Sequence, residues 1–302
     1  MTIKSKFLGE LTSAIAAANP MQRAFLDTSI HSMTDEEVQA LEAYLNYCIS
    51  TGQTVEYLGQ CYDLIVKDTL REQFFFQKNK RYRYSTYAEV ADSVYLNDEY
   101  MDMYMHGLAI TSFLWPNHRE MRRYFLQQMP KKTGGKYLEI GPGHGIYLLS
   151  AMQRTAYDFF EGVDISPKSI ELTRNVLDSG HFGKFENFDL YCRDFLGEDM
   201  AHQQYDAIVM GEVLEHVEDP AAFLRTIRSL AGKDSFIYIT TCIDAPAIDH
   251  IYLFDSVDSL EHLIESSGLS IIDRLVVPYE NMSLEESSEN RMPVNVAYVL
   301  GA

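Results

Sequence analysis

Beyond about residue 130 the chain alternates short apolar runs with amphipathic helical stretches, and this alternation limits the possible folds more than any other feature. The apolar runs predict five strands, at residues 136–140, 159–164, 189–194, 205–210 and 235–240. Helical periodicity between and after them predicts helices over 146–154, from Pro167 onward, over 219–231 and over 256–267. Alternation of this kind predicts an α/β fold, in which right-handed crossovers build a doubly wound parallel sheet.

The end of the chain breaks the alternation. Two further strands are predicted at 269–277 and 293–300, and the intervening segment 280–291 is rich in Glu, Ser and Asn. We expect a loop there and no helix. A terminal hairpin would then add an antiparallel strand to a mostly parallel sheet.

The first 129 residues carry helical periodicity and few strand-like runs. Helices are predicted over 35–49, 54–70 and 86–106, the first with a capping box formed by Thr34 and Glu37. The opening sequence MTIKSKFLGELTSAIAAANP predicts an amphipathic helix, because polar residues interrupt its apolar stretch too often for a signal peptide. Two domains are therefore expected, a helical cap over 1–129 and a sheet domain over 130–302.

The later part of this helical region is unusually rich in Tyr, Met and Phe. These side chains form either an ordinary helical core or an apolar substrate pocket, since such pockets are aromatic and adaptable. Trp115, the only tryptophan, has the same two interpretations. Tyr104, His106 and His118 are candidate pocket residues.

Charge excludes several classes of partner. The chain has 44 acidic and 25 Lys or Arg residues, for a formal net charge of −19 with His neutral. Binding to nucleic acid or to an anionic membrane needs clustered cations, so neither partner is expected. No apolar segment is long enough to span a membrane.

Four cysteines, Cys48, Cys61, Cys192 and Cys242, show no close pairing. In a chain of this length they predict buried thiols in a reducing compartment and a cytoplasmic location. An aromatic-rich cap also makes a homodimer plausible.

The segment Glu139-Ile-Gly-Pro-Gly-His-Gly145 lies between the first predicted strand and its helix. Glycines at such a position let a ligand approach the backbone and the helix N-terminus closely. The dinucleotide fingerprint GxGxxG would place its third glycine at position 146, where this chain has Ile146. The observed spacing is GxGxG, with an acidic residue two positions before the first glycine.

This motif, with Asp164 at the end of the second predicted strand, resembles that of class I S-adenosylmethionine (SAM)-dependent methyltransferases. The family has a Rossmann-like seven-stranded sheet, which matches the predicted strand order and terminal hairpin. The resemblance implies that the glycines bound the methionine part of SAM, that Asp164 binds the ribose hydroxyls with Ile165 against the adenine, and that Asp194 and Phe195 contact the adenine. The segment 205–220 resembles the fourth family motif, especially that of ubiquinone-biosynthesis O-methyltransferases. The implied cofactor-binding residues are Glu139, Gly141, Gly143, Gly145, Asp164, Ile165, Asp194, Phe195 and Gly211.

A second constellation follows the fourth predicted strand, where Glu212, Glu215 and His216 form ExxEH and His250 follows the fifth strand. Two carboxylates and two imidazoles suit Mg²⁺, Mn²⁺, Fe²⁺ or Zn²⁺. The pattern also resembles the metal-binding set of certain O-methyltransferases, which implies a cation that binds and activates an acceptor hydroxyl. Two alternatives stay open: His216 or His250 acts as a metal-free general base, or the residues only shape the loop.

The sequence therefore predicts an enzyme that methylates a small-molecule acceptor, most plausibly on oxygen. A metal-free N- or C-methyltransferase is the rival within enzymes. A catalytically silent SAM-binding partner subunit is the rival from another class. Methylation of small RNAs shares the ExxEH pattern but conflicts with the acidic charge.

Overall fold

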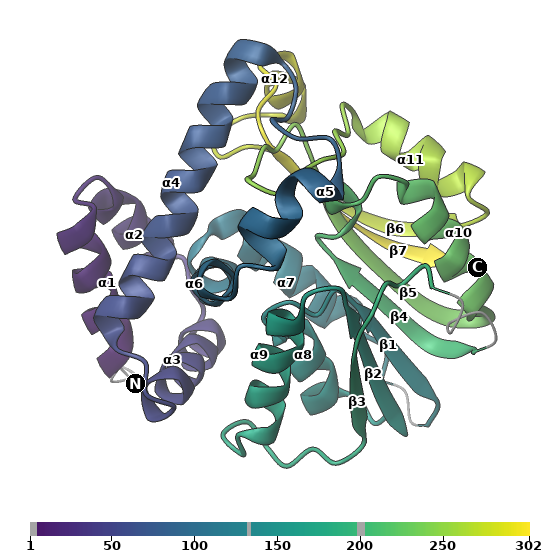
Figure 1. Cartoon of the computed structure of the whole chain (residues 1–302), viewed down its shortest axis with the longest axis horizontal. Helices are drawn as coiled ribbons and strands as arrows, with labels where there is room; N and C mark the ends of the chain where they lie inside the picture. The colour runs from purple at the N-terminus through teal and green to yellow at the C-terminus, as the bar shows by residue number, and fades with distance from the viewer. Residues whose placement is uncertain (1–4, 132–133, 198–202) are drawn as a thin grey trace.

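A twisted seven-stranded sheet forms the centre of the computed structural model, which describes residues 5–131, 134–197 and 203–302 (Figure 1). The strand order is β3-β2-β1-β4-β5-β7-β6, and β7 alone runs antiparallel to its neighbours β5 and β6. This arrangement confirms the predicted α/β fold, including the antiparallel terminal strand. The strands are β1 (Lys136–Ile140), β2 (Phe159–Asp164), β3 (Phe188–Cys192), β4 (Tyr205–Gly211), β5 (Ala231–Ile243), β6 (Ser270–Val277) and β7 (Val294–Gly301).

Helices cover both faces of the sheet because its strands alternate apolar side chains between two cores. In β1, Tyr137 belongs to one core, whereas Leu138 and Ile140 belong to the other. One face is covered by α7 (Pro116–Gln128), α8 (Ile146–Arg154) and α9 (Pro167–Asp178), and the other by α10 (Pro220–Leu230) and α11 (Val257–Ser266).

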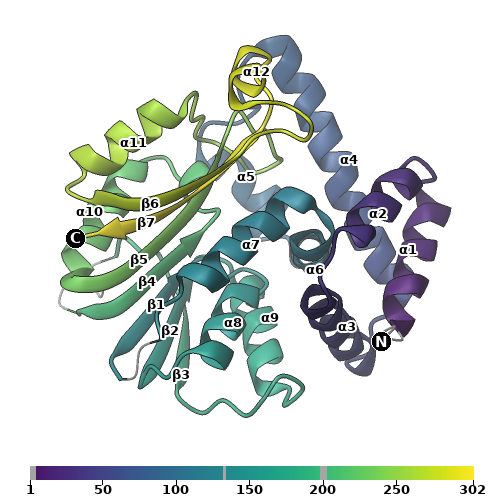
Figure 2. The same cartoon turned by 180° about the vertical axis from the view of Figure 1, so that it is seen from behind.

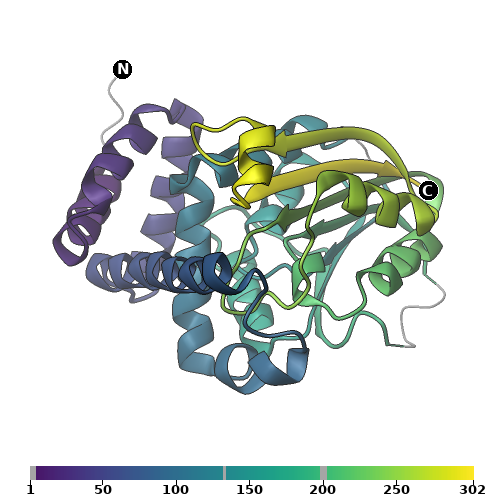
Figure 3. The same cartoon turned by 90° about the horizontal axis from the view of Figure 1, so that it is seen from above.

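The N-terminal helices, α1 to α6, lie at one end of the molecule, away from α10 and α11 (Figure 3). Thr34 and Glu37 form the predicted capping box at the start of the third helix. Residues 1–4 of the predicted first helix lie outside the described residues. The elements are α1 (Lys6–Ala18), α2 (Gln22–His31), α3 (Asp35–Ser50), α4 (Val55–Asn79), α5 (Tyr87–Val90), the π-helix η1 (Ala91–Tyr95) and α6 (Asp98–Leu114).

Two predictions about helices were wrong in extent. The single helix expected over 86–106 is divided into α5, η1 and α6, because Asn97 caps α6 by accepting a hydrogen bond from the Tyr100 N–H (3.0 Å). The helix expected over 54–70 continues to Asn79 and ends only at Lys80, whose backbone is left-handed (φ 55°).

The segment 280–291 contains a helix where only a loop was predicted. The short helix α12 (Leu284–Glu289) begins at a capping box made by Ser283 and Glu286. That Ser-x-x-Glu signature is visible in the sequence, so the missed helix could have been predicted from it.

The N-terminal helices and the sheet share one apolar core. It runs without interruption from residues such as Leu11 and Phe113 to Tyr238 and Val299 of the sheet. Helix α7 packs against β6 and β7, and the Tyr238 hydroxyl donates to the carbonyl of Met121 (3.0 Å). The division between residues 129 and 130 stays a prediction.

The far end of α4 reaches the connection between β6 and β7, beside α12 (Figure 2). There the Gln77 amide donates to the carbonyl of Arg291 (3.1 Å), whose guanidinium lies over the ring of Phe76 (5.1 Å). Arg291 also pairs with Asp244 (2.5 Å) in the loop after β5. The first and last parts of the chain are therefore in direct contact.

Three of the four cysteines, Cys48, Cys61 and Cys242, are buried as predicted. Cys192 is exposed, which contradicts the prediction, because it ends β3 at the edge of the sheet. Within the described ranges, no helix combines the length and the apolar character needed to cross a membrane.

Candidate functional site

The glycine-rich segment forms a tight loop between β1 and α8, as the sequence predicted. Gly141, Gly143 and Gly145 all have positive φ (66°, 54° and 76°), which disfavours any residue with a side chain. A Cβ added at Gly141 would lie 2.6 Å from Cγ2 of Val213, so the loop also passes very close to the segment after β4. The carboxyl ends of β1 and β4 thus meet at this loop.

Glu139, the acidic residue of the motif, lies inside the protein and is 2% exposed. Its carboxyl group accepts hydrogen bonds from the Tyr137 hydroxyl (2.7 Å) and the Leu148 N–H (3.1 Å). Burial raises the pKa of Glu139 to about 8. Glu139 therefore links β1 to the first turn of α8.

Asp164, at the end of β2, joins the glycine loop to the start of α9. Its carboxylate accepts hydrogen bonds from the N–H groups of Gly143 (3.2 Å) and Ser166 (2.8 Å). Burial raises the pKa of Asp164 to about 6 although both N–H groups favour the charged form. Ile165, beside it, is 43% exposed, so its side chain is accessible to the adenine ring that the sequence predicts there.

The other predicted cofactor residues lie at neighbouring strand ends. Asp194 follows β3 and accepts a hydrogen bond from the Leu196 N–H (3.0 Å). Phe195 is buried against Phe223, with ring centroids 5.3 Å apart. Gly211 ends β4, where an added Cβ would lie 3.5 Å from the Tyr147 ring. Their roles in binding a cofactor stay predictions.

The residues of the ExxEH segment and His250 come together at the carboxyl ends of β4 and β5. His216 Nε2 lies 3.9 Å from a carboxylate oxygen of Glu215, and the imidazole rings of His216 and His250 are 4.7 Å apart. Glu212 adjoins Glu215 and adopts positive φ (52°), with its N–H donating to the Thr240 hydroxyl (3.0 Å). We call Glu212, Glu215, His216 and His250 the Glu–His cluster.

Burial disfavours the charged forms of the groups in the Glu–His cluster. Burial raises the pKa of Glu212, and burial together with the neighbouring Glu212 charge raises that of Glu215 well above its usual range. Glu215 is fully buried and accepts a hydrogen bond from the Thr241 hydroxyl (2.7 Å). Burial also lowers the pKa of His250 to about 3, so this imidazole is neutral.

Backbone carbonyls orient both imidazoles. The Nδ1 atom of His250 lies 2.5 Å from the carbonyl oxygen of Ala245, and Nδ1 of His216 lies 3.1 Å from that of Asp249. Since a carbonyl oxygen only accepts hydrogen bonds, each Nδ1 carries the proton and each Nε2 keeps a lone pair. This is the tautomer that imidazoles adopt when Nε2 binds a metal.

Residues that the sequence did not single out as ligands complete the surroundings. Two groups of three residues could each hold a metal ion, because the ligand atoms within each group lie within 4.8 Å of one another. Both groups contain His250. The first also contains Glu215 and Cys242, and the second His216 and Asp249. Asp249 directly precedes His250, which is a signal that sequence reasoning could have used.

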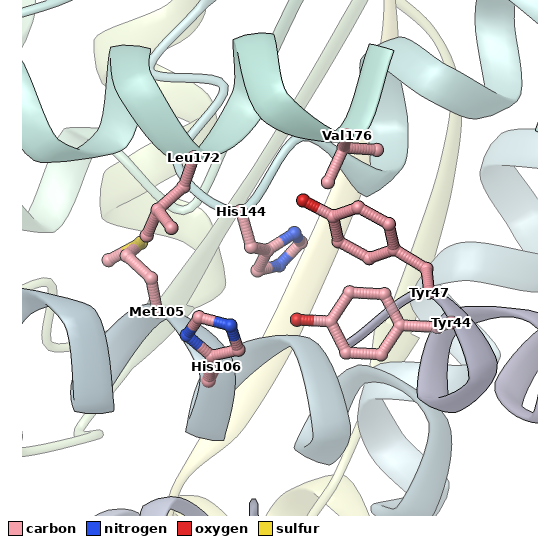
Figure 4. A pocket seen from close by; sticks show the side chains of 7 residues that line it. All are labelled: Tyr44, Tyr47, Met105, His106, His144, Leu172 and Val176. Atoms are coloured by element: carbon pink, nitrogen blue, oxygen red, sulfur yellow. The ribbon is translucent and has the colours of Figure 1, made fainter. Parts of the chain in front are cut away.

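A small pocket lies next to His144 of the glycine loop, between α3, α6 and α9 (Figure 4). The hydroxyls of Tyr44 and Tyr47 point toward its centre, and the imidazoles of His106 and His144 border it (Figure 4). His106 is thus one predicted pocket residue that does line a pocket. The Trp115 indole instead donates to the Tyr62 hydroxyl (3.2 Å) among the N-terminal helices, and its ring lies 5.0 Å from that of His118.

Comparison with known proteins agrees with this geometry. A ubiquinone biosynthesis O-methyltransferase of Neisseria meningitidis serogroup C (strain 053442) is 31% identical over 108 residues, which cover 36% of this chain and 44% of the relative. The chain spans about half the length of the curated relatives it matches.

Solved structures with the same fold have little sequence similarity to the chain. The Haloferax volcanii partner of the Trm112 methyltransferase activator has a TM-score of 0.52 at 12% identity and covers 68% of this chain and 97% of its own. The cyclase SpnF has a TM-score of 0.50 at 11% identity and covers 61% and 80%. At these identities the likeness shows the fold alone.

The family model described as a methyltransferase domain matches residues 116–274, more than half of the chain. The match includes the glycine loop, Asp164 and the whole Glu–His cluster, and it begins at α7. The chain therefore belongs to the methyltransferase-domain family of enzymes.

Proposed function

We propose that the protein is a SAM-dependent methyltransferase that methylates a hydroxyl oxygen of a small-molecule acceptor, with a divalent cation held by the Glu–His cluster. Membership of the methyltransferase-domain family supports methyl transfer. The name shared by the matched relatives, ubiquinone biosynthesis O-methyltransferase, supports an oxygen acceptor.

The residues at the glycine loop fit SAM. There is no room for a side chain at Gly141, positive φ disfavours one at Gly143, and the Asp164 carboxylate lies beside the loop, where it could accept hydrogen bonds from the ribose hydroxyls. When bound, SAM supplies a methyl group activated by a sulfonium, so no nucleophile of the chain need form a covalent bond.

The inward-facing groups of the Glu–His cluster carry the proposal of a cation. Nε2 of His216 lies 3.9 Å from a carboxylate oxygen of Glu215, the rings of His216 and His250 are 4.7 Å apart, and Glu212 lies beside Glu215, so groups that can bind a cation gather here. Among the described residues, no lysine or arginine pairs with either glutamate. Two neighbouring buried carboxyl groups are costly to ionise without a nearby positive charge, and oxygen and imidazole ligands together suit Mg²⁺, Mn²⁺, Fe²⁺ or Zn²⁺.

The chain's own residues would then bind and orient the two reactants. Glu212, Glu215, His216 and His250 would hold the cation, which when bound supplies a Lewis acid that lowers the pKa of an acceptor hydroxyl. The Thr241 hydroxyl fixes one oxygen of Glu215. Because the glycine loop and the cluster lie at the ends of neighbouring strands β1 and β4, donor and acceptor would meet in one place. Such alignment supplies up to about 7–11 kcal/mol in well-oriented reactions.

Calorimetric titration with S-adenosylhomocysteine, with and without Mg²⁺ or Mn²⁺, tests the cofactor. Micromolar binding with no binding of NAD is expected, whereas a preference for NAD would overturn the proposal. Acceptor screening before and after EDTA treatment then separates the functions. Turnover lost with EDTA and restored by the cation supports the proposal, EDTA-resistant turnover indicates a metal-free enzyme, and cofactor binding without turnover on any acceptor indicates a silent partner.

Replacing Glu215 tests the cation site directly. Glu215→Ala and His250→Ala are each expected to abolish tight binding of the cation, measured by equilibrium dialysis and elemental analysis, because each removes an inward-facing ligand. Glu171→Gln, which alters a surface glutamate paired with Lys168, is the control and should leave binding unchanged. Equal cation content in all four proteins, or none in the wild type, would contradict the metal site.

A further inference from the structure

Asp249 is a buried carboxylate held by two tyrosines of the N-terminal helices. It is 2% exposed and directly precedes His250. The Tyr104 hydroxyl of α6 donates to one carboxylate oxygen (2.9 Å), and the Tyr95 hydroxyl of η1 donates to the other (3.2 Å). Nδ1 of His216 lies 3.4 Å from the carboxylate oxygen that Tyr95 contacts.

The protons in this network can be assigned from the groups present. The hydroxyls of Tyr95 and Tyr104 each lie within hydrogen-bond distance of the Asp249 carboxylate, which can only accept, so both donate to it. Since Tyr95 gives its single proton to Asp249, its oxygen can only accept from His216 Nδ1, 3.1 Å away.

Every group that faces Nδ1 of His216 is therefore an acceptor: the Tyr95 oxygen, the Asp249 carboxylate and the Asp249 carbonyl. Only the tautomer with the proton on Nδ1 satisfies all three. That tautomer leaves a lone pair on Nε2, which lies 3.9 Å from Glu215 on the inward side of the cluster.

We propose that Asp249, Tyr95 and Tyr104 form a positioning set that fixes the tautomer and orientation of His216. None of the three touches the reacting atoms in this assignment; they act through His216. The consequence for cation binding rests on the proposed function, because it requires that Nε2 of His216 be a ligand. Since both tyrosines come from the N-terminal helices, these helices are then part of the site.

The tautomer of His216 can be measured without any cation. Long-range ¹H–¹⁵N spectra of histidine-labelled, cation-free protein distinguish a proton on Nδ1 from one on Nε2, and a His216→Asn variant identifies the signals. The wild type should carry the proton on Nδ1. Asp249→Asn places an amide that can donate beside Nδ1 while the Asp249 carbonyl remains, so it should increase the fraction of His216 with the proton on Nε2, whereas Tyr95→Phe should broaden the His216 signals by freeing the ring.

Tyr100→Phe is the matched control. Tyr100 lies on the same helix as Tyr104 and stacks on its ring (5.5 Å between centroids), but its hydroxyl donates to Asp68. This variant should keep the wild-type His216 signals. Circular dichroism confirms that each variant folds, and Tyr95→Phe, which removes one oxygen, keeps the test available if Asp249→Asn does not fold.

Mn²⁺ titration of the same proteins adds the second readout. Asp249→Asn and Tyr95→Phe are expected to weaken Mn²⁺ binding by about 10–100-fold, the usual loss when a partner of a ligand histidine is removed. Unchanged His216 spectra in both variants would overturn the positioning set. Changed spectra in a protein that binds no Mn²⁺ would support the positioning set and overturn the cation instead.

Discussion

Asp164 is the residue on which the cofactor assignment depends most directly. Asp164→Ala should weaken binding of S-adenosylhomocysteine by more than about tenfold, or about 1.4 kcal/mol, because the ribose hydroxyls lose their acceptor. Calorimetry measures the affinity. Asp189→Ala is the control, since that exposed carboxylate lies on the neighbouring strand and accepts a hydrogen bond from the Tyr191 hydroxyl (3.2 Å). Equal affinity in the wild type and Asp164→Ala would remove the ribose assignment.

Glu139 makes stability depend on pH. Its pKa is about 8 in the folded protein and about 4.3 in an unfolded chain, so between these values the folded state holds a proton that the unfolded state has released. The free energy of unfolding therefore falls as pH rises from about 4.3 to about 8.

Glu139→Gln tests this effect because it keeps an acceptor for the Leu148 N–H but cannot ionise. Denaturant unfolding at pH 5, 6.5 and 8 measures the free energy of unfolding. Relative to the wild type, that of the variant should rise by a few kcal/mol between pH 5 and pH 8, because each unit of pKa shift corresponds to about 1.4 kcal/mol. Glu186→Gln, a surface substitution next to Lys184, should follow the wild type. Parallel curves for the wild type and Glu139→Gln would show that Glu139 ionises normally.

The sequence located the Glu–His cluster but not the residues around it. Glu212, Glu215 and His216 lie within five positions, so one turn of chain keeps them together, and His250 could be paired with them because parallel strands end at one edge. Tyr95 and Asp249 are separated by 154 positions, and their contact depends on how the N-terminal helices pack on the sheet. No local pattern encodes that contact.

At the scale of elements, the turn from β1 to α8 requires glycine. Gly141→Ala should cost about 1–3 kcal/mol of folding free energy, because alanine would adopt positive φ and its Cβ would lie 2.6 Å from Val213. Binding of S-adenosylhomocysteine should weaken as the loop shifts. Thermal unfolding and calorimetry measure the two effects.

Gly9→Ala is the control for this substitution. Gly9 lies inside helix α1 with no atom within 4 Å of an added Cβ, so alanine should stabilise the protein by about 0.5–1 kcal/mol. If Gly141→Ala unfolded at the wild-type temperature, the loop would not need its left-handed backbone.

Periodicity predicted elements well where the apolar pattern continues through the whole element without a capping residue inside it, as in β1 and α3. It failed over 86–106, where apolar spacing continues but Asn97 supplies a capping side chain in mid-pattern. The failure has consequences for the site, because the resulting π-helix η1 ends at Tyr95, next to His216.

At the scale of the whole molecule, the shared core predicts that both halves unfold together. Trp115 reports on the N-terminal helices by fluorescence, whereas far-UV circular dichroism reports on the entire chain. The two thermal transitions should superimpose, because one apolar cluster includes both α1 and β7. Loss of the Trp115 signal before the main transition would instead indicate two independently stable halves.

The sequence predicted the alternation of strands and helices along the chain and the antiparallel terminal strand, but not how the two halves meet. Strand–helix alternation determines the sheet because crossovers obey a fixed handedness. The amphipathic pattern of α7 shows that one face is buried, but does not show that this face lies on β6 and β7.

The continuous interior restricts how such a protein can diverge. An exchange of modules between relatives that joins the chains between residues 129 and 130 would import a foreign α7, whose buried face would have to match Tyr238 and Val299 of the recipient. If the chains were joined at Trp115 instead, before α7, the contact between α7 and the sheet would stay intact. The imported helices α1 to α6 would still have to fit the part of the same core that they share with α7 and the sheet. Helices α1 to α6 of a relative could therefore replace those of this chain only where their buried side chains also fit that core.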